Sequence, residues 1–121
     1  MATAVAAPVA RDILLFALAG ALTEAARGAA EVLTDPDAWA AATGYVTIGV
    51  ESVSPDESLL AYSVDTRGDE YFTLCVRALA DGREVVRLPG CCAGGAWSPD
   101  SRHFYFLRAD GAHRPSELWC L

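Results

Sequence analysis

A tetrapeptide that occurs twice constrains this chain more than any other feature of its sequence. Residues 54–57 read Ser-Pro-Asp-Glu and residues 98–101 read Ser-Pro-Asp-Ser, and each copy precedes an apolar run. The interval between the two copies is 44 residues, and a period of roughly 40–50 residues is that of a four-stranded propeller blade. Because one blade cannot bury both of its faces alone, such a repeat indicates neighbouring blades that stack on each other.

The residues around each tetrapeptide predict the strands of these blades. β-Branched, aromatic and alternating residues favour strands, and Asp81-Gly82 is a hairpin signal. We interpret the glycine-rich stretch 90–95 as the connection between blades. The predicted fold class is mainly β: a partial β-propeller of about two four-stranded antiparallel blades, one over about 46–88 and an incomplete one over about 94–121. The expected strands cover 45–53, 59–65, 71–79, 84–88, 94–97, 103–108 and 116–121.

The amino-terminal part has a different composition. Residues 1–30 are rich in alanine, and the apolar run 13–22 is shorter than the about 20 residues that span a bilayer. Arg11 stands beside Asp12, so the positive charge that precedes the apolar run of a signal peptide is missing. We therefore predict an Ala-rich helical or poorly ordered leader over 1–33, with a cleaved signal or an anchor as alternatives, and the partial propeller over 34–121.

A short helix is expected where the composition changes. Asp35 can cap a helix, and Pro36 suits its first position. The helix is predicted over 37–43, and Gly44 ends it.

Charge and cysteine content exclude several functions. The net charge of −7 disfavours nucleic acid and anionic membranes as partners. The four cysteines form no C-x-x-C pair, so we expect free thiols in a reducing compartment, and hence a cytoplasmic protein, with disulfides, metal binding and export as alternatives. These cysteines are Cys75, Cys91, Cys92 and Cys120.

No catalytic, cofactor-binding or metal-binding residue is predicted, and no cofactor. The sequence has no G-x-S-x-G nucleophile elbow and no P-loop. The acidic cluster Asp65, Asp69 and Glu70 lacks the spacing of a calcium loop and is interpreted as a solvated turn. His103 and His113 define no triad, and Trp97 and Trp119 are interpreted as blade-packing residues, with a carbohydrate or peptide platform as the alternative.

Residues 54–82 carry a family resemblance. Their order S-P-D-E-S-L-L-A-Y-S-V-D, G-D-E and T-L-C-V-R-A-L-A-D-G resembles the amino-terminal propeller of the prolyl oligopeptidase family, and most of all its oligopeptidase B (protease II) branch. Residues 96–108, Arg114-Pro115, Leu118-Trp119 and 31–35 resemble further parts of that propeller. The resemblance covers about 31–121.

The resemblance implies a seven-bladed propeller that covers an α/β-hydrolase domain and limits substrate size in a serine peptidase of short peptides. The family's catalytic Ser, Asp and His lie in the hydrolase domain, and no position here matches their motifs. The sequence departs from the family pattern at Glu57, where a glycine is usual, at Cys120-Leu121, where a basic pair is expected, and over 1–30.

The functional expectation follows from this resemblance. We expect a fragment of the substrate-gating propeller of an oligopeptidase B-like serine endopeptidase. The fragment is expected to be inert without the catalytic domain. Whether the chain itself is an enzyme stays open. Its partners would be short peptides in the parent enzyme and the hydrolase domain or a second copy. The alternative is a non-enzymatic propeller-type interaction module that oligomerises through its open blade faces.

Overall fold

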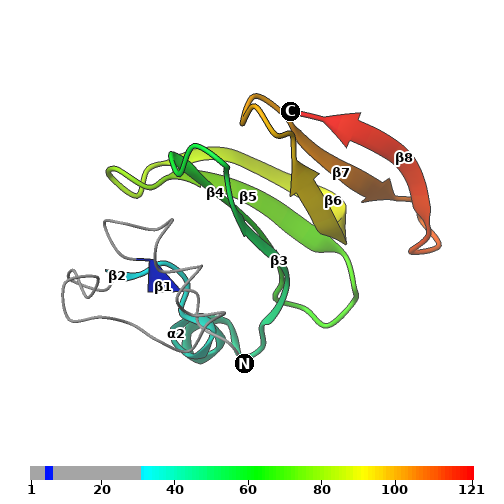
Figure 1. Ribbon diagram of the computed structural model, residues 1–121. Coiled ribbons are helices and arrows are strands. Elements are labelled where there is room, and N and C mark those ends of the chain that lie inside the picture. Colours follow the sequence, from blue (N-terminus) through cyan, green and yellow to red (C-terminus); the bar gives the residue numbers. More distant parts are fainter. Residues whose placement is uncertain (1–4, 7–30) are drawn as a thin grey trace, which may run out of the picture. The chain divides into compact units, whose positions relative to one another are not determined.

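The computed structural model describes residues 5–6 and 31–121 (Figure 1). The chain divides into two compact units, Met1–Pro36 and Asp37–Leu121. In the first unit, β1 (Val5–Ala6) pairs antiparallel with β2 (Glu31–Val32). Most of the predicted leader lies outside the described residues. Within the described part, no helix is long and apolar enough to cross a membrane.

Helix α2 (Pro36–Thr43) begins at the predicted proline. Gly44 follows it with φ of +85°, and its N–H donates to the Ala40 carbonyl at 2.7 Å. A positive φ is accessible to glycine without strain, which explains why the helix ends where the sequence predicts.

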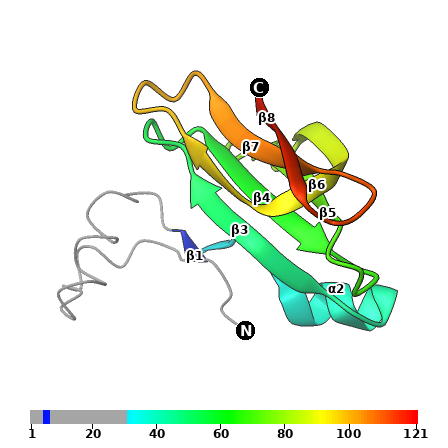
Figure 2. The same ribbon diagram turned by 90° about the vertical axis from the view of Figure 1, so that its right-hand side faces the viewer.

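The second unit contains one six-stranded antiparallel sheet in which every strand pairs with its neighbour in the sequence. Figures 1 and 2 show that this sheet is strongly curled. The fold class predicted from the repeat, a mainly β partial propeller, is confirmed. In order, the strands are β3 (Thr47–Val53), β4 (Leu59–Asp65), β5 (Phe72–Ala78), β6 (Glu84–Trp97), β7 (Phe104–Ala109) and β8 (Pro115–Cys120).

Strand β6 differs from the prediction, because the stretch 90–95, which we interpreted as the connection between blades, lies within this continuous strand. Its first half pairs with β5, and its second half pairs with β7. Cys91 is the transition point, since it is paired with Phe72 on one side and with Arg108 on the other. Gly90, with φ of +75°, allows a bend without ending the strand. One strand thus ends the first blade and begins the second.

The core lies between the two blades. Strands β4 and β5 contribute Ala61, Leu74 and Val76, and strand β7 contributes Phe104 and Phe106, all at most 3% exposed. The alternation predicted for 71–79 is confirmed here, because Leu74 and Val76 face the core. Burying a large apolar side chain stabilises a fold by about 1.5–3 kcal/mol, so this cluster is the main reason why the blades stay together.

Candidate functional site

The first Ser-Pro-Asp turn is closed by its own side chains. The Ser54 hydroxyl donates to Asp56 Oδ1 at 2.6 Å and accepts the N–H of Leu59 at 3.0 Å. The hydrogen bond that Ser54 donates, and then those that the Ser58 hydroxyl and N–H donate, lower the pKa of the Asp56 carboxyl. Glu57 completes the turn with φ of +61°, the backbone conformation that the usual glycine adopts more easily.

The second turn repeats this arrangement and touches the first. The Ser98 hydroxyl donates to Asp100 Oδ1 at 2.5 Å and accepts the N–H of His103 at 3.0 Å. Ser101 has φ of +63°, and its hydroxyl accepts the N–H of Asp56 at 2.9 Å. The 44-residue repeat is therefore a repeat in three dimensions, and the two copies are joined by a hydrogen bond.

The first strands of the two blades lie side by side. The Ser63 hydroxyl donates to the Ala93 carbonyl at 2.6 Å and accepts the N–H of Val50 at 3.0 Å. Further along, the Trp97 indole donates to the Ser52 carbonyl at 2.9 Å. We call this contact between β3 and the second half of β6 the blade seam. In a propeller, such first strands surround the central channel.

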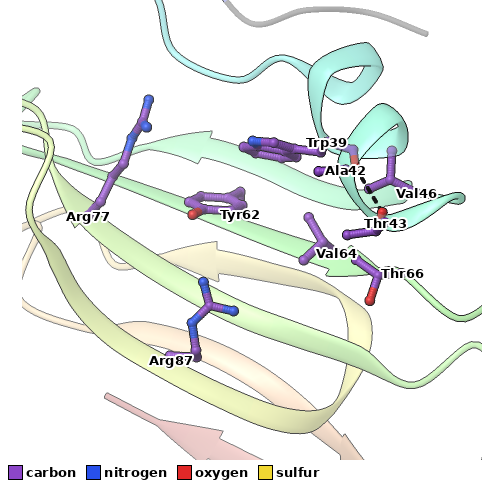
Figure 3. A pocket seen from close by; sticks show the side chains of 9 residues that line it. All are labelled: Trp39, Ala42, Thr43, Val46, Tyr62, Val64, Thr66, Arg77 and Arg87. Carbon is purple, nitrogen blue, oxygen red and sulfur yellow. Dashed lines mark hydrogen bonds between the residues drawn. The ribbon is translucent and has the colours of Figure 1, made fainter.

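A pocket of about 320 Å³ lies within the second unit, beside the carboxyl end of α2 (Figure 3). The rings of Trp39 and Tyr62 stack at 5.4 Å with an angle of 26°. The Thr43 hydroxyl donates to the Trp39 carbonyl at 2.8 Å, which ties this end of the helix. The lining residues are Trp39, Ala42, Thr43, Val46, Tyr62, Val64, Thr66, Arg77 and Arg87.

The pKa values of Arg87 and Tyr62, two residues of the pocket lining, are shifted by their surroundings. Glu84 accepts hydrogen bonds from Arg87 Nε and Nη2 at 2.8 and 2.7 Å, and these bonds raise the pKa of the guanidinium. Burial raises the pKa of Tyr62 to about 12, and burial also raises the pKa of the neighbouring Cys75 thiol. At neutral pH the pocket lining therefore includes a neutral Tyr62 and a cationic Arg87 that is paired with Glu84.

The two histidines contact tyrosine rings. His113 lies 4.0 Å from the ring of Tyr71, and His103 lies 6.2 Å from the ring of Tyr105. The Tyr71 hydroxyl also donates to the Asp110 carbonyl at 2.6 Å. His113 and its loop thus anchor the second blade to the start of β5.

The carboxylate of Asp65 organises the loop after β4. It accepts the N–H groups of Arg67, Gly68 and Glu70 at 2.8, 2.9 and 2.9 Å. Burial raises the pKa of Asp65, but these hydrogen bonds outweigh burial and lower it. Both carboxylate oxygens are therefore occupied by the backbone. Among residues 31–121 and the described pair 5–6, no group of three His, Cys, Asp or Glu side chains could hold a metal ion.

The cysteines and tryptophans occupy contrasting positions. The four cysteines are free, with Cys75 and Cys91 buried and Cys120 exposed. Trp97 packs edge-on against Phe104 at 5.0 Å. Trp119 is 45% exposed on β8, so only the first of these two tryptophans packs between blades in the structure.

The pocket was not predicted from the sequence. One signal was present: the alternation over 71–79 places Thr73, Cys75 and Arg77 on the face away from the core. Arg87 and Trp39 come from other elements, and only the tertiary structure brings them to that face. Trp39 offers a second signal in retrospect, since it is the only aromatic residue of α2.

A four-strand repeat and a second repeat of three strands, which share strand β6 and have matching turns, define one blade and part of another blade of a β-propeller. Residues 14–119 match the family described as prolyl oligopeptidase, N-terminal beta-propeller domain. The chain belongs to this family, in its propeller domain.

Relatives and solved structures agree with this assignment. The chain is 38% identical over 81 residues to "Uncharacterized peptidase y4qF" of Sinorhizobium fredii (strain NBRC 101917 / NGR234), an alignment that covers 67% of this chain and 11% of that protein. Oligopeptidase B from Leishmania major matches with a TM-score of 0.68 at 22% identity, over 76% of this chain and 13% of the other. Oligopeptidase B from Trypanosoma brucei, in a closed form with covalently bound antipain, matches with a TM-score of 0.64 at 25% identity, over 76% and 13% of the two chains. The chain thus spans about a tenth of the length of these proteins.

Proposed function

We propose that this chain provides two blades of the substrate-gating propeller of an oligopeptidase B-like serine endopeptidase. The blade seam carries this proposal. Two first strands held together by side-chain hydrogen bonds form a rigid segment of a channel wall, and such a wall limits the size of peptides that reach a catalytic centre behind it. The similarity to oligopeptidase B from Trypanosoma brucei supports the choice of this branch of the family. Short peptides and a hydrolase domain are the partners that this role requires.

We further propose that the 121-residue chain does not hydrolyse peptides by itself. The family's nucleophile motif G-x-S-x-G does not occur in it. The imidazole rings of His103 and His113 lie against tyrosine rings in the structure, and among the described contacts neither imidazole is hydrogen-bonded to a serine hydroxyl. Four free cysteines support a reducing compartment such as the cytoplasm.

A chromogenic peptide with arginine before the scissile bond tests both proposals. The purified chain is expected to release no chromophore above a buffer control. Addition of a separately expressed hydrolase domain from a homologous oligopeptidase B is expected to leave the chain inert but to retain it in a pull-down. Turnover by the chain alone that a serine-directed reagent abolishes would contradict its inertness.

A second candidate function is favoured by the open face of the second blade. Tyr105, Leu107 and Leu118 are 43%, 38% and 72% exposed on one face of β7 and β8, and clustered exposed apolar side chains mark interaction surfaces. In this alternative, the chain is a non-enzymatic module that oligomerises through its blade faces. Mass measurement in solution distinguishes the two functions, because a discrete oligomer at micromolar concentration supports the module and a monomer supports the gating role.

A further inference from the structure

Strand β8 forms an open edge of the six-stranded sheet. It pairs with β7 on one side, and no described strand pairs with it on the other. All six residues of β8 are exposed, and Figure 1 shows the strand at one side of the curled sheet. An edge of this kind presents backbone N–H and C=O groups that can pair with a further strand.

The hydrogen bonds to β7 show which backbone groups of β8 face outward. Leu121 and Phe104 exchange two bonds, in which the N–H of each donates to the carbonyl of the other at 3.1 and 3.2 Å. In an antiparallel pair, hydrogen-bonded residues of this kind alternate with residues whose N–H and C=O groups point to the other side. Because the register is regular along this part of the ladder, the N–H and C=O groups of Leu118 and Cys120 point away from β7.

The first blade shows what pairs with the equivalent edge. Residues 118–120 follow residues 74–76 of β5 by the 44-residue interval of the repeat, and residues 74–76 pair antiparallel with residues 86–88 of β6. The two outer members of that partner segment, Val86 and Leu88, are apolar. The equivalent partner of β8 is therefore an extended segment with apolar side chains at alternating positions.

The two faces of the edge differ in chemistry. On one face, Leu118 is 72% exposed beside Leu107, so an apolar side chain opposite Leu118 would remove it from water. On the other face, Arg108 lies over the ring of Trp119 at 5.2 Å and is paired in register with Glu117. The edge thus offers apolar contact on one face and one charge of each sign on the other.

The charge of the chain distinguishes between possible occupants of the edge. Each copy of the chain carries a net charge of −7, so two copies repel each other. The same charge attracts a segment of opposite sign. A positively charged segment of another polypeptide is therefore favoured over a second copy.

We propose that the outer edge of β8 binds an extended, positively charged segment of another polypeptide by β-strand addition. The segment lies antiparallel to β8, exchanges hydrogen bonds with Leu118 and Cys120, and has apolar side chains opposite these two residues. This binding goes beyond the proposed function and does not rest on it. Strand β7 separates the edge from the second half of β6, so an empty edge leaves the gating role at the blade seam intact.

Amide hydrogen exchange of the isotopically labelled chain, measured by nuclear magnetic resonance in a reducing buffer, tests the proposal. The probe is the acetylated and amidated hexapeptide Arg-Glu-Val-Val-Arg-Leu, the sequence of residues 83–88, in which two arginines and one glutamate give a net charge of +1. At a peptide concentration of about ten times its Kd, the amides of Leu118 and Cys120 are expected to exchange about ten-fold more slowly. The amide of Trp119, which is bonded to β7, should change little. Absence of slowing at Leu118 and Cys120 up to millimolar peptide would overturn the proposal.

Two N-methylated peptides test the backbone contact. Residues opposite each other in a hydrogen-bonded pair exchange both bonds, so methylation at the positions of Val86 and Leu88 removes the donors that face β8 and should abolish the slowing. Methylation at the positions of Val85 and Arg87 is the matched control, because these amides face away from β8, and the slowing should persist. Equal behaviour of the two methylated peptides would overturn strand addition.

Variants of the chain locate the contact at β8. Leu118→Pro removes an N–H that faces outward, so it is expected to weaken peptide binding about ten-fold and to keep the fold, since proline is tolerated at such positions of an edge strand. Leu118→Val keeps the N–H and should bind the peptide nearly as the parent chain does. Urea unfolding separates lost binding from lost folding. A folded Leu118→Pro variant with undiminished affinity would overturn the assignment to β8.

Charge and dilution test the choice of occupant. A peptide with glutamate in place of both arginines is expected to bind more weakly, and the difference should shrink at high salt. Equal affinity of the two peptides at low salt would contradict the requirement for positive charge. Slow exchange of Leu118 and Cys120 without peptide, which becomes fast on dilution of the chain, would show that a second copy occupies the edge and would overturn the choice of another polypeptide.

Discussion

The indole N–H of Trp97 donates a hydrogen bond of 2.9 Å to the backbone carbonyl of Ser52 and so joins two blades across the seam. Ser52 is next to Val53, which is related to Trp97 by the 44-residue interval of the repeat. The bond therefore connects nearly equivalent positions of consecutive repeats. Since its partners are 45 residues apart in the sequence, it depends on the packing of the blades and reports on it.

Replacing Trp97 with phenylalanine is expected to lower the free energy of unfolding by about 1–3 kcal/mol, because the Ser52 carbonyl loses its donor and the seam loses volume. Urea denaturation followed by circular dichroism measures the change. Trp119→Phe is the control: Trp119 also donates a hydrogen bond, to Glu117 at 2.7 Å, but on an exposed strand, and we expect a change within about 0.5 kcal/mol. Equal losses in the two variants would show that the seam bond has no special role.

Gly49 allows the two blades to approach each other. A Cβ atom at this position would lie 2.5 Å from the Ala93 carbonyl oxygen and 2.5 Å from Ser63 Oγ, so Gly49→Ala must push the seam apart. We expect a loss of about 1–3 kcal/mol in unfolding free energy, the usual cost of overpacking. Gly94→Ala is the matched control, because nothing lies within 4 Å of a Cβ there. A Gly49→Ala variant as stable as Gly94→Ala would contradict the packing of β3 against β6.

Glycine substitution is expected to stabilise the first Ser-Pro-Asp turn more than the second. Glu57→Gly removes the left-handed strain at φ of +61° and is expected to stabilise the chain by up to about 1 kcal/mol. Ser101→Gly removes similar strain but also the hydroxyl that accepts the N–H of Asp56, so its net gain should be smaller or absent. Thermal and urea unfolding of the two variants test this order, and a larger gain for Ser101→Gly would refute the role of the link between turns.

The loop carboxylate predicts how stability depends on pH. The hydrogen bonds from the backbone lower the pKa of Asp65 in the folded state, although burial acts against them. Its stabilising contribution is therefore complete above its unfolded pKa of about 3.9 and is lost as the pH falls through the lower, folded value. The difference in unfolding free energy between the parent chain and Asp65→Asn should be constant from pH 7 to about pH 5 and should shrink toward zero in more acidic solution. A difference that grows on acidification would contradict the direction of the shift.

At neutral pH, Asp65→Asn should cost about 1.5–3 kcal/mol because hydrogen bonds to a charged acceptor are lost. Asp81→Asn is a control at an exposed turn, where the carboxylate accepts the N–H of Arg83 at 2.9 Å. Its cost should stay below about 1 kcal/mol.

Local patterns were sufficient to predict much of the sheet. The strand expected over 59–65 coincides with β4, since a Pro-Asp turn before it and a glycine-containing loop after it mark both ends. The repeat interval and the alternation over 71–79 also identified the face that packs between blades. Each of these features depends on a few consecutive residues, so it is visible in the sequence.

Features made by distant residues could not be predicted. The glycine-rich stretch 90–95 has the composition of a loop, and only its pairing with β5 and β7 keeps it in one strand. The pocket beside α2 needs Trp39 from α2 and Arg87 from β6 on one side of a curled sheet. Neither residue has a local pattern that indicates the other, and the curl that brings them together is a property of the whole sheet.

A two-dimensional nuclear Overhauser experiment on the isotopically labelled chain can detect the packing of the two blades against each other. We expect cross-peaks from the Phe104 ring of the second blade to the methyl groups of Ala61 and Val76 of the first, since all three lie in one buried cluster. Regular strand signals without any cross-peak between Phe104 and these methyl groups would contradict it, because the blades would then fold without stacking.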